Sequence, residues 1–222
     1  MKIVGISDIH GNLDIDIPKC DVVCCCGDIM PLYIQNDAVR STLWVIRDFN
    51  DWVNGLECDK FILIGGNHDR LFEHYDPKSI LNNDKIVYLQ DESYNYKNRV
   101  FYGSPWCPDL SQWSFYKSSQ ELVEVFNKIP FHVDVLLTHC PPKYNQCGVV
   151  LEPGWNFGKN FGCQELAEST QSRNILWHLF GHVHSGNHNI EHRDNFRSNL
   201  MVHVSVLNEE YKLNYKPFEF YI

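Results

Sequence analysis

The chain has 222 residues, 44% of them hydrophobic, which is enough for one substantial core, so we expect a single domain over residues 1–222. Its formal net charge of −9 and its scattered Lys and Arg residues argue against a long nucleic acid as ligand. No apolar run approaches the roughly 20 residues of a membrane span, and the first residues lead straight into a strand pattern, so we expect no membrane contact and a cytoplasmic location.

The first third of the chain alternates strand and helix patterns. Short apolar runs at 2–6 and 21–26 are typical of strands buried on both faces. A helix is predicted over 38–53, where apolar residues recur at steps of three and four, and a third strand over 61–64. The apolar stripe of this helix comprises Val39, Leu43, Ile46, Phe49 and Val53.

The rest of the chain continues this alternation. Residues 86–89 and 99–102 are predicted to form a strand pair. Ser118 and Glu121 have the spacing of a capping box, so a helix is expected to begin there and run through Ile129. The remaining predicted elements are strands at 133–137, 176–180, 201–206 and 218–221 and a short helix near 164–168. This pattern predicts an α/β fold with its ligand at the carboxyl ends of the strands.

Nine cysteines do not indicate a disulfide scaffold. Their number is odd, no Cys-x-x-Cys pair occurs, and Cys24, Cys25 and Cys26 are consecutive within a predicted strand. We therefore expect reduced, space-filling thiols in a reducing compartment.

Five short polar blocks carry the chemistry, and each follows a predicted strand. The blocks are Asp8-Ile9-His10, Gly27-Asp28, Gly66-Asn67-His68-Asp69, Thr138-His139 and Gly181-His182-Val183-His184. On an extended segment Asp8 and His10 would point to one side and share a metal, and His182 and His184 would repeat that geometry. The carboxylate, amide and imidazole groups together predict a metal cluster at one sheet edge.

Each block alone has a simpler explanation. An Asp-x-His pair occurs by chance, and Asp28 or Asn67 could be a turn residue or a helix cap. Chance does not explain ligands after five separate strands. Gly27, Gly66 and Gly181 add support, because glycine permits close backbone approach or a positive φ where the chain leaves its strand.

The order of these blocks resembles the calcineurin-like (class III) metallophosphoesterase superfamily over nearly the whole chain. Residues 102–106, 137–142, 162–166 and 205–208 further resemble its metallophosphoesterase-domain-containing (MPPED) subgroup. The resemblance implies a four-layer αββα sandwich of two mixed β-sheets.

The resemblance also implies a site with two divalent metal ions. One ion would be held by Asp8, His10, Asp28 and His184, and the other by Asp28, Asn67, His139 and His182. A hydroxide bridging the two ions would attack phosphorus, with His68 donating a proton to the leaving oxygen or steadying the phosphoryl group. Asp69 would orient His68 or its loop, or simply cap a turn. Mn²⁺ is the ion expected in vitro, and Fe, Ni, Co or Zn also suit such ligands.

We therefore expect a phosphodiesterase acting on a small phosphate ester, such as a cyclic nucleotide. A phosphomonoesterase or a nucleoside-polyphosphate hydrolase remains an alternative, for which Lys143 and Lys159 are the available cations. A weakly active metal-binding scaffold for partner recognition is another, and a nuclease is disfavoured by charge.

Two aromatic loops, 104–117 and 141–161, are expected to border the site. Trp106 or Trp155 could stack on a nucleobase, or these rings could pack the loops onto the sandwich.

Overall fold

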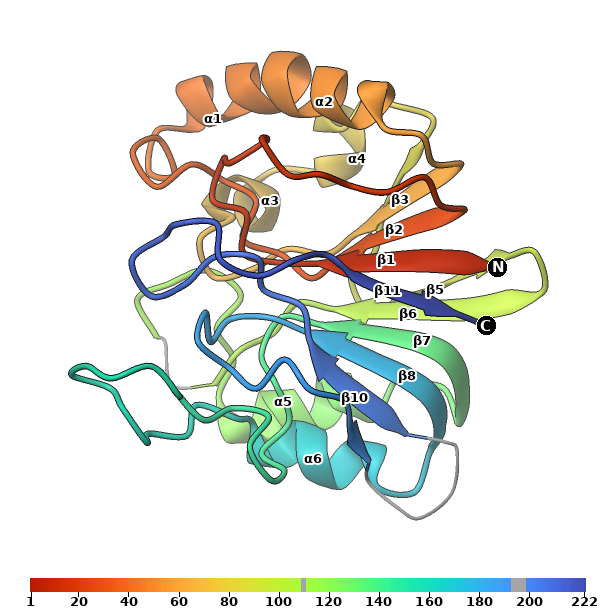
Figure 1. Ribbon diagram of the computed structural model, residues 1–222, viewed down its shortest axis with the longest axis vertical. Helices are drawn as coiled ribbons and strands as arrows, with labels where there is room; N and C mark the ends of the chain where they lie inside the picture. The colour runs from red at the N-terminus through yellow and green to blue at the C-terminus, as the bar shows by residue number, and fades with distance from the viewer. Residues whose placement is uncertain (109–110, 193–198) are drawn as a thin grey trace.

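The computed structural model describes residues 1–108, 111–192 and 199–222. Two mixed β-sheets lie face to face, and helices cover the outer face of each (Figure 1). The expected four-layer αββα sandwich is confirmed.

The first sheet has the strand order β11-β1-β2-β3-β4. Its strands are β1 (Lys2–Ile6), β2 (Val22–Cys25), β3 (Lys60–Leu63), β4 (Ile86–Tyr88) and β11 (Phe218–Tyr221). β1 to β4 are parallel, and β11 runs antiparallel to β1. Alternate residues serve two cores: Cys25 packs beneath the helices, whereas Cys24 and Cys26 pack between the sheets. This is why the three consecutive cysteines are all buried.

The second sheet has the strand order β5-β6-β7-β8-β10-β9. Its strands are β5 (Glu92–Tyr96), β6 (Arg99–Ser104), β7 (His132–Thr138), β8 (Asn174–Phe180), β9 (Glu191–His192) and β10 (Leu200–His203). β6, β7, β8 and β10 are parallel, and the edge strands β5 and β9 are antiparallel to their neighbours.

The predicted pairing of residues 86–89 with 99–102 is wrong. β4 belongs to the first sheet, and β6 pairs instead with β5. Lys97 and Asn98 join β5 to β6 with φ of 47° and 61°, the left-handed geometry of a tight hairpin turn. β5 has a mostly polar sequence because it is an edge strand, so hydrophobic patterning did not reveal it.

Helices shield both sheets (Figure 1). A nearly continuous helix lies over the first sheet, with α3 and α4 on the same side, and α5 and α6 lie over the second sheet. The elements are α1 (Ala38–Trp44), the π-helical η1 (Val45–Phe49), α2 (Asn50–Gly55), α3 (Arg70–His74), α4 (Pro77–Ile80), α5 (Ser119–Phe126) and α6 (Gln164–Thr170). The capping box of Ser118 and Glu121 is confirmed, but α5 ends before Ile129, which lies in a following turn.

The π-helical segment changes which face of the first helix is buried. Val39, Leu43 and Ile46, predicted to face the core, are 69%, 44% and 49% exposed. Trp44, Val45, Phe49 and Val53 form the buried face instead. A π turn contains more residues than an α turn, so it rotates the apolar face relative to a regular 3.6-residue period.

All nine cysteines are free thiols, as expected, and Cys20 is the one that is not fully buried. Across the described ranges, the helices are all too short or too polar to cross a bilayer.

The altered helix face predicts different costs for two truncations. Phe49→Ala should lower the free energy of unfolding by about 3–5 kcal/mol because it empties a buried site. Ile46→Ala should change it by no more than about 0.5 kcal/mol, since that side chain is half exposed. Urea denaturation monitored by circular dichroism measures both free energies of unfolding. Equal losses in the two variants would contradict the assignment of Phe49 to the buried face and Ile46 to the exposed face.

Candidate metal centre

The five polar blocks come together where the two sheets meet. Three of them follow the adjacent strands β1, β2 and β3, and two follow the adjacent strands β7 and β8. The backbone N–H of His182 donates to both carboxylate oxygens of Asp8, at 3.0 Å each, and so joins the two sheets. His139 Nδ1 lies 2.7 Å from the carbonyl oxygen of Cys26, again across the sheets. These contacts bring the carboxyl ends of both sheets together.

Glycine makes these approaches possible. Gly27 has a φ of 92°, which disfavours other residues. A Cβ at Gly66 would overlap Asp28 Oδ1, and one at Gly181 would overlap Ser7 Oγ and Asp8 Oδ2. All three glycines therefore have the roles expected of them.

One group of potential ligands consists of Asp8, His10 and His184. His10 Nε2 lies 3.2 Å from His184 Nε2, and His184 Nε2 lies 3.8 Å from Asp8 Oδ1. His184 Nδ1 lies 3.1 Å from the carbonyl oxygen of Asn208, so this nitrogen can donate there and leave Nε2 free for a cation. Asp8 and His10 have φ of 55° and 42°, so they converge through a left-handed turn and not through the expected extended segment.

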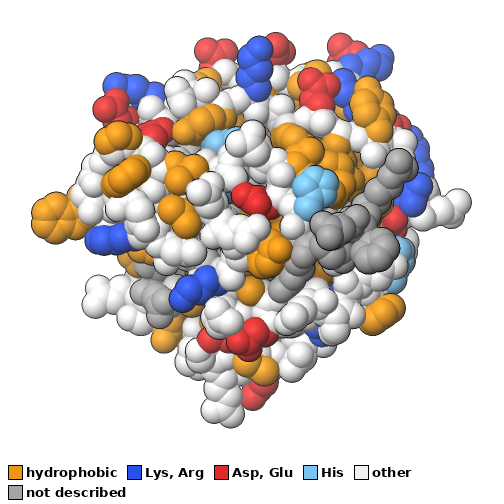
Figure 2. All heavy atoms as spheres, turned by 60° about the horizontal axis from the view of Figure 1, so that its bottom comes forward, with side chains coloured by type: hydrophobic (Ala, Val, Ile, Leu, Met, Phe, Trp, Pro, Cys, Tyr) orange, Lys and Arg blue, Asp and Glu red, His pale blue; other side chains and the backbone are white. Residues whose placement is uncertain are grey.

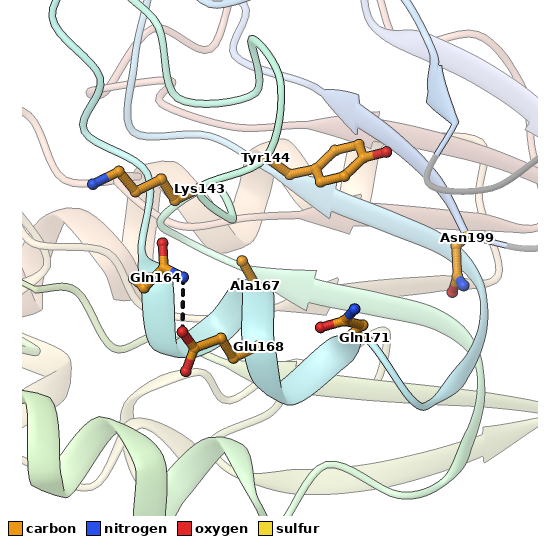
Figure 3. A pocket seen from close by; sticks show the side chains of 7 residues that line it. All are labelled: Lys143, Tyr144, Gln164, Ala167, Glu168, Gln171 and Asn199. Atoms are coloured by element: carbon orange, nitrogen blue, oxygen red, sulfur yellow. Dashed lines mark hydrogen bonds between the residues drawn. The ribbon is translucent and has the colours of Figure 1, made fainter.

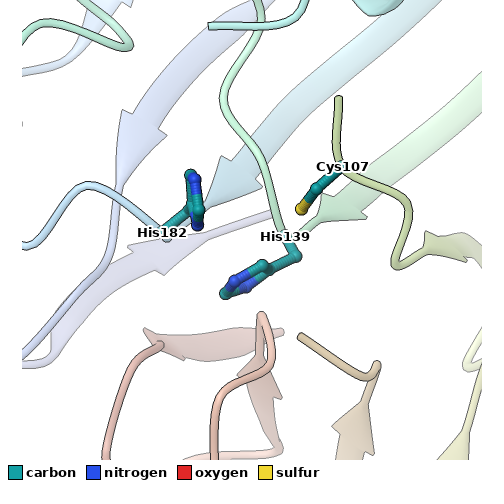
Figure 4. A group of neighbouring side chains, drawn as sticks. All are labelled: Cys107, His139 and His182. Carbon is teal, nitrogen blue, oxygen red and sulfur yellow. The ribbon is translucent and has the colours of Figure 1, made fainter. Parts of the chain in front are cut away.

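A second group lies on the other side of Asp28. Asn67 Oδ1 is 2.8 Å from His139 Nε2 and 2.9 Å from His182 Nδ1, and His139 Nε2 is 3.4 Å from Asp28 Oδ2. The buried thiol of Cys107 also lies close enough to His139 and His182 for a shared ion (Figure 4). The sequence reasoning missed Cys107, which belongs to none of the five blocks.

Burial gives these groups unusual electrostatics. Burial raises the pKa of Asp8, whereas the pKa of Asp28 is well below its usual range because His139 and His68 outweigh the effect of burial. Burial opposes protonation of His139, yet Asp28 raises the pKa of His139 to about 9. Burial lowers the pKa of His10 and of His182 to about 3. The neutral imidazoles of His10 and His182, the carboxylates and the Asn67 amide oxygen suit divalent cations, and a bound cation would take the place of the proton on His139.

His68 lies beside both groups. Its backbone N–H donates to Asp28 Oδ1 at 2.8 Å, and its Nε2 is 4.0 Å from Asp28 Oδ2. Its Nδ1 lies 2.6 Å from Oε1 of Gln35, a residue that the sequence reasoning did not single out. Burial lowers the pKa of His68.

Of the alternatives expected for Asp69, the structure shows contacts with the backbone of its own loop and of the loop after β2. Its fully buried carboxylate accepts backbone N–H bonds from Asp28, Ile29, Met30 and Gly66 at 2.7–3.0 Å. Burial and the charge of Asp28 raise the pKa of Asp69 to about 7. These bonds fix the loops after β2 and β3, so Asp69 holds the backbone of the site and does not contact the His68 ring.

The segment after β10 covers part of the site with Glu209 and Tyr211. Val204 N–H still donates to Phe180 of β8, but Val206 N–H donates to the carbonyl oxygen of Ser7 at 3.1 Å, so the chain crosses to the first sheet at 205–206. The strand predicted over 201–206 therefore ends at His203. Tyr211 then places its ring 5.1 Å from that of His10 and 4.8 Å from that of His184. A hollow of about 100 Å³ remains, lined by Asp28, Asn67, His68, His182, His184, Glu209 and Tyr211. Glu209 and Tyr211 follow directly after the resembling segment 205–208, but the sequence analysis did not single them out.

The two aromatic loops differ in their relation to this hollow. Trp106 donates from Nε1 to Asp91 at 2.8 Å and packs against Phe115, so it is a packing residue. Trp155 is 94% exposed. Trp113, in the predicted loop but not named there, lies with its ring 4.5 Å from His68.

A larger cavity of about 410 Å³ lies elsewhere, beside α6 (Figure 3). It is lined by Lys143, Tyr144, Gln164, Ala167, Glu168, Gln171 and Asn199, none of which belongs to the five blocks. Volume alone does not indicate the reactive site in this protein.

The chain is similar to known proteins of one family. The model of the calcineurin-like phosphoesterase family matches residues 1–186. Metallophosphoesterase domain-containing protein 1 of Homo sapiens is 31% identical over 215 residues, which are 83% of this chain and 61% of that protein. A UPF0046 protein of Caenorhabditis elegans is 27% identical, over 100% of this chain and 75% of its own length. This chain thus spans less than two thirds of the human relative.

Solved structures contain the same fold. Phosphopantetheinyl hydrolase from Mycobacterium tuberculosis superposes with a TM-score of 0.59 at 15% sequence identity, covering 95% of this chain and 90% of that one. At this identity the likeness concerns the fold alone.

The close approach at Gly181 predicts a sharp effect of one methyl group. Gly181→Ala should weaken Mn²⁺ binding by about 10- to 100-fold, because the Cβ displaces Asp8. Gly154→Ala is the matched control, since a Cβ there has nothing within 4 Å. Isothermal titration calorimetry with Mn²⁺ measures the binding. Unchanged affinity in Gly181→Ala would show that the added Cβ does not displace Asp8.

Proposed function

The chain belongs to the calcineurin-like phosphoesterase family, and on that premise we propose that it is a binuclear phosphodiesterase for small substrates. The observation that carries the proposal is the position of Asp28. Its Oδ2 lies 3.7 Å from His10 Nε2 and 3.4 Å from His139 Nε2, so one carboxylate faces both ligand groups. The proposed metal ligands are Asp8, His10, Asp28, Asn67, His139, His182 and His184.

When bound, two divalent cations neutralise phosphoryl charge and activate water. The side chains of the chain itself hold the ligand geometry and move the proton. Asp28 supplies the shared carboxylate, and Asp69 fixes the backbone from which Asp28 projects. His68 Nε2 faces the same hollow and can protonate the leaving oxygen or steady the phosphoryl group.

The lining of the hollow favours a diester over a monoester. A monoester carries an additional negative charge, which a nearby Lys or Arg would neutralise. The described residues around the hollow include neither, and they include the carboxylate of Glu209. Lys143 lines the cavity beside α6 (Figure 3). Lys159 donates to Asn156 at 3.0 Å.

A second hollow of about 190 Å³ adjoins the first and shares His182 and Glu209 with it. Phe161 and Val150 give it an apolar wall, and Asn156 adds an amide. We assign the organic group of the substrate to this hollow, where a nucleobase of a small cyclic nucleotide can stack on Phe161.

A nuclease fits the surface less well. On the face seen in Figure 2, the Lys and Arg side chains of the described residues are dispersed among acidic and hydrophobic ones. A protein that binds a nucleic-acid backbone normally carries a stripe of basic residues along it.

The nine cysteines are all free thiols, which is typical of a reducing compartment. We therefore propose that the protein acts in the cytoplasm.

The proposal predicts Mn²⁺-dependent hydrolysis that requires Asp28. The wild-type protein should hydrolyse bis-p-nitrophenyl phosphate and a 2′,3′- or 3′,5′-cyclic nucleotide faster than p-nitrophenyl phosphate. Asp28→Asn should lose this activity and much of its metal, since an amide lacks the charge to hold two cations. Steady-state kinetics and elemental analysis measure the two effects.

Asp16→Asn serves as the matched control, because that carboxylate is exposed and lies outside the site. A faster rate with p-nitrophenyl phosphate would favour the monoesterase. Two firmly bound ions and no turnover on any substrate would favour the scaffold.

Removal of the His68 ring should separate catalysis from metal binding. His68→Ala should keep its metals and lose about 10²- to 10⁴-fold in turnover, with the smaller loss on p-nitrophenyl esters, whose leaving group needs little protonation. His74→Ala, at an exposed position of α3, should retain full turnover. Equal losses on all substrates would assign His68 to charge stabilisation and not to proton donation.

A further inference from the structure

We propose that Gln35 is a positioning residue that fixes the orientation and tautomer of His68. This inference rests on the proposed function. Gln35 Oε1 lies 2.6 Å from His68 Nδ1. An amide oxygen can only accept a hydrogen bond, so Nδ1 keeps its proton throughout, and Nε2 is left as the nitrogen that takes up a proton and gives it to the leaving oxygen.

Nε2 is the nitrogen that faces the reactive hollow. It lies 4.0 Å from Asp28 Oδ2, on the side of the ring opposite Gln35. The ring is further enclosed by Trp113, at 4.5 Å between centroids, and by His10, at 4.8 Å. Packing restrains the plane of the ring, but only a hydrogen bond determines which nitrogen faces the substrate. Gln35 supplies that bond.

Gln35 lies on a rigid support. It sits in a turn between Pro31 and α1, next to Ile34, which is 4% exposed. The carbonyl oxygen of Ile34 accepts bonds from Ser41 Oγ and from the backbone N–H of Asp37, both at 2.8 Å. Asp37 in turn caps α1 by accepting from the N–H of Arg40. The turn is therefore fixed on both sides of Gln35, as a positioning residue requires.

The neutral amide suits this position. Asp8, Asp28 and Asp69 already bring three buried carboxyl groups into the site. A carboxylate at residue 35 would orient the ring equally well but would add a further negative charge beside Asp28. An amide orients the ring without that charge.

The test compares two substitutions of equal length. Gln35→Met removes the acceptor, and Gln35→Glu retains one. Gln35 lines a hollow of about 300 Å³ with Asn36, so either side chain has room. Gln35→Met should reduce kcat for the cyclic nucleotide by about 10- to 100-fold with little change in KM, and Gln35→Glu should recover most of the loss. Asn36→Ala, at the exposed neighbouring position, is the control.

A double-mutant cycle excludes a merely structural role. In a His68→Ala background, Gln35→Met should have no further effect on kcat, because the group that it positions is absent. Equal losses in Gln35→Met and Gln35→Glu, or additive losses in the cycle, would overturn the inference.

The ¹⁵N NMR spectrum of the His68 ring provides a readout that does not depend on turnover. Metal-free wild-type protein should show a protonated Nδ1, and Gln35→Met should show a mixture of tautomers. A protonated Nε2 in the wild type would refute the inference even in an active enzyme. Absence of hydrolysis together with a protonated Nδ1 would refute the proposed function and leave the hydrogen bond in place.

Discussion

The burial of Asp28 is the constraint on which the rest of the structure depends. Its side chain is 2% exposed and lies where both sheets end, so its charge needs compensation from inside the protein. His139 provides a proton beside it, and the backbone N–H of His68 donates to its other oxygen. Two cations would neutralise the same carboxylate more fully. Burial of Asp28 therefore favours metal binding at this position.

Asp69 fixes the backbone that positions Asp28. Its four N–H bonds join the loop after β2 to the loop after β3, so the positions of Asp28 and Asn67 depend on each other. Gly66 and Gly181 let the loops approach as closely as these bonds require. The centre is thus built from backbone contacts as much as from ligands, and changes outside the ligand set can disturb it.

Some features were out of reach of sequence patterns for reasons that can be named. The edge strand β5 offers only the partly buried Tyr94 and Tyr96 to the core, too weak a pattern to detect, so the partner of β6 was assigned wrongly. The π-helical segment η1 breaks the 3.6-residue period from which the buried face was inferred. Gln35 is separated from His68 by 33 residues and belongs to no motif, so only the folded turn reveals the contact.

The sequence patterns by themselves predicted an α/β fold, because apolar strands that end in polar blocks place those blocks at one sheet edge. The resemblance of the blocks to a known family added the αββα architecture and the seven residues we propose as ligands. The tertiary structure decided which of these side chains meet and what surrounds them. It placed Asp28 between two ligand groups and brought Gln35, Glu209 and Tyr211 to the site. It also showed that Asp69 accepts hydrogen bonds from the backbone of the site. Strand periodicity is a local property of the chain, whereas these contacts join segments that only packing brings together.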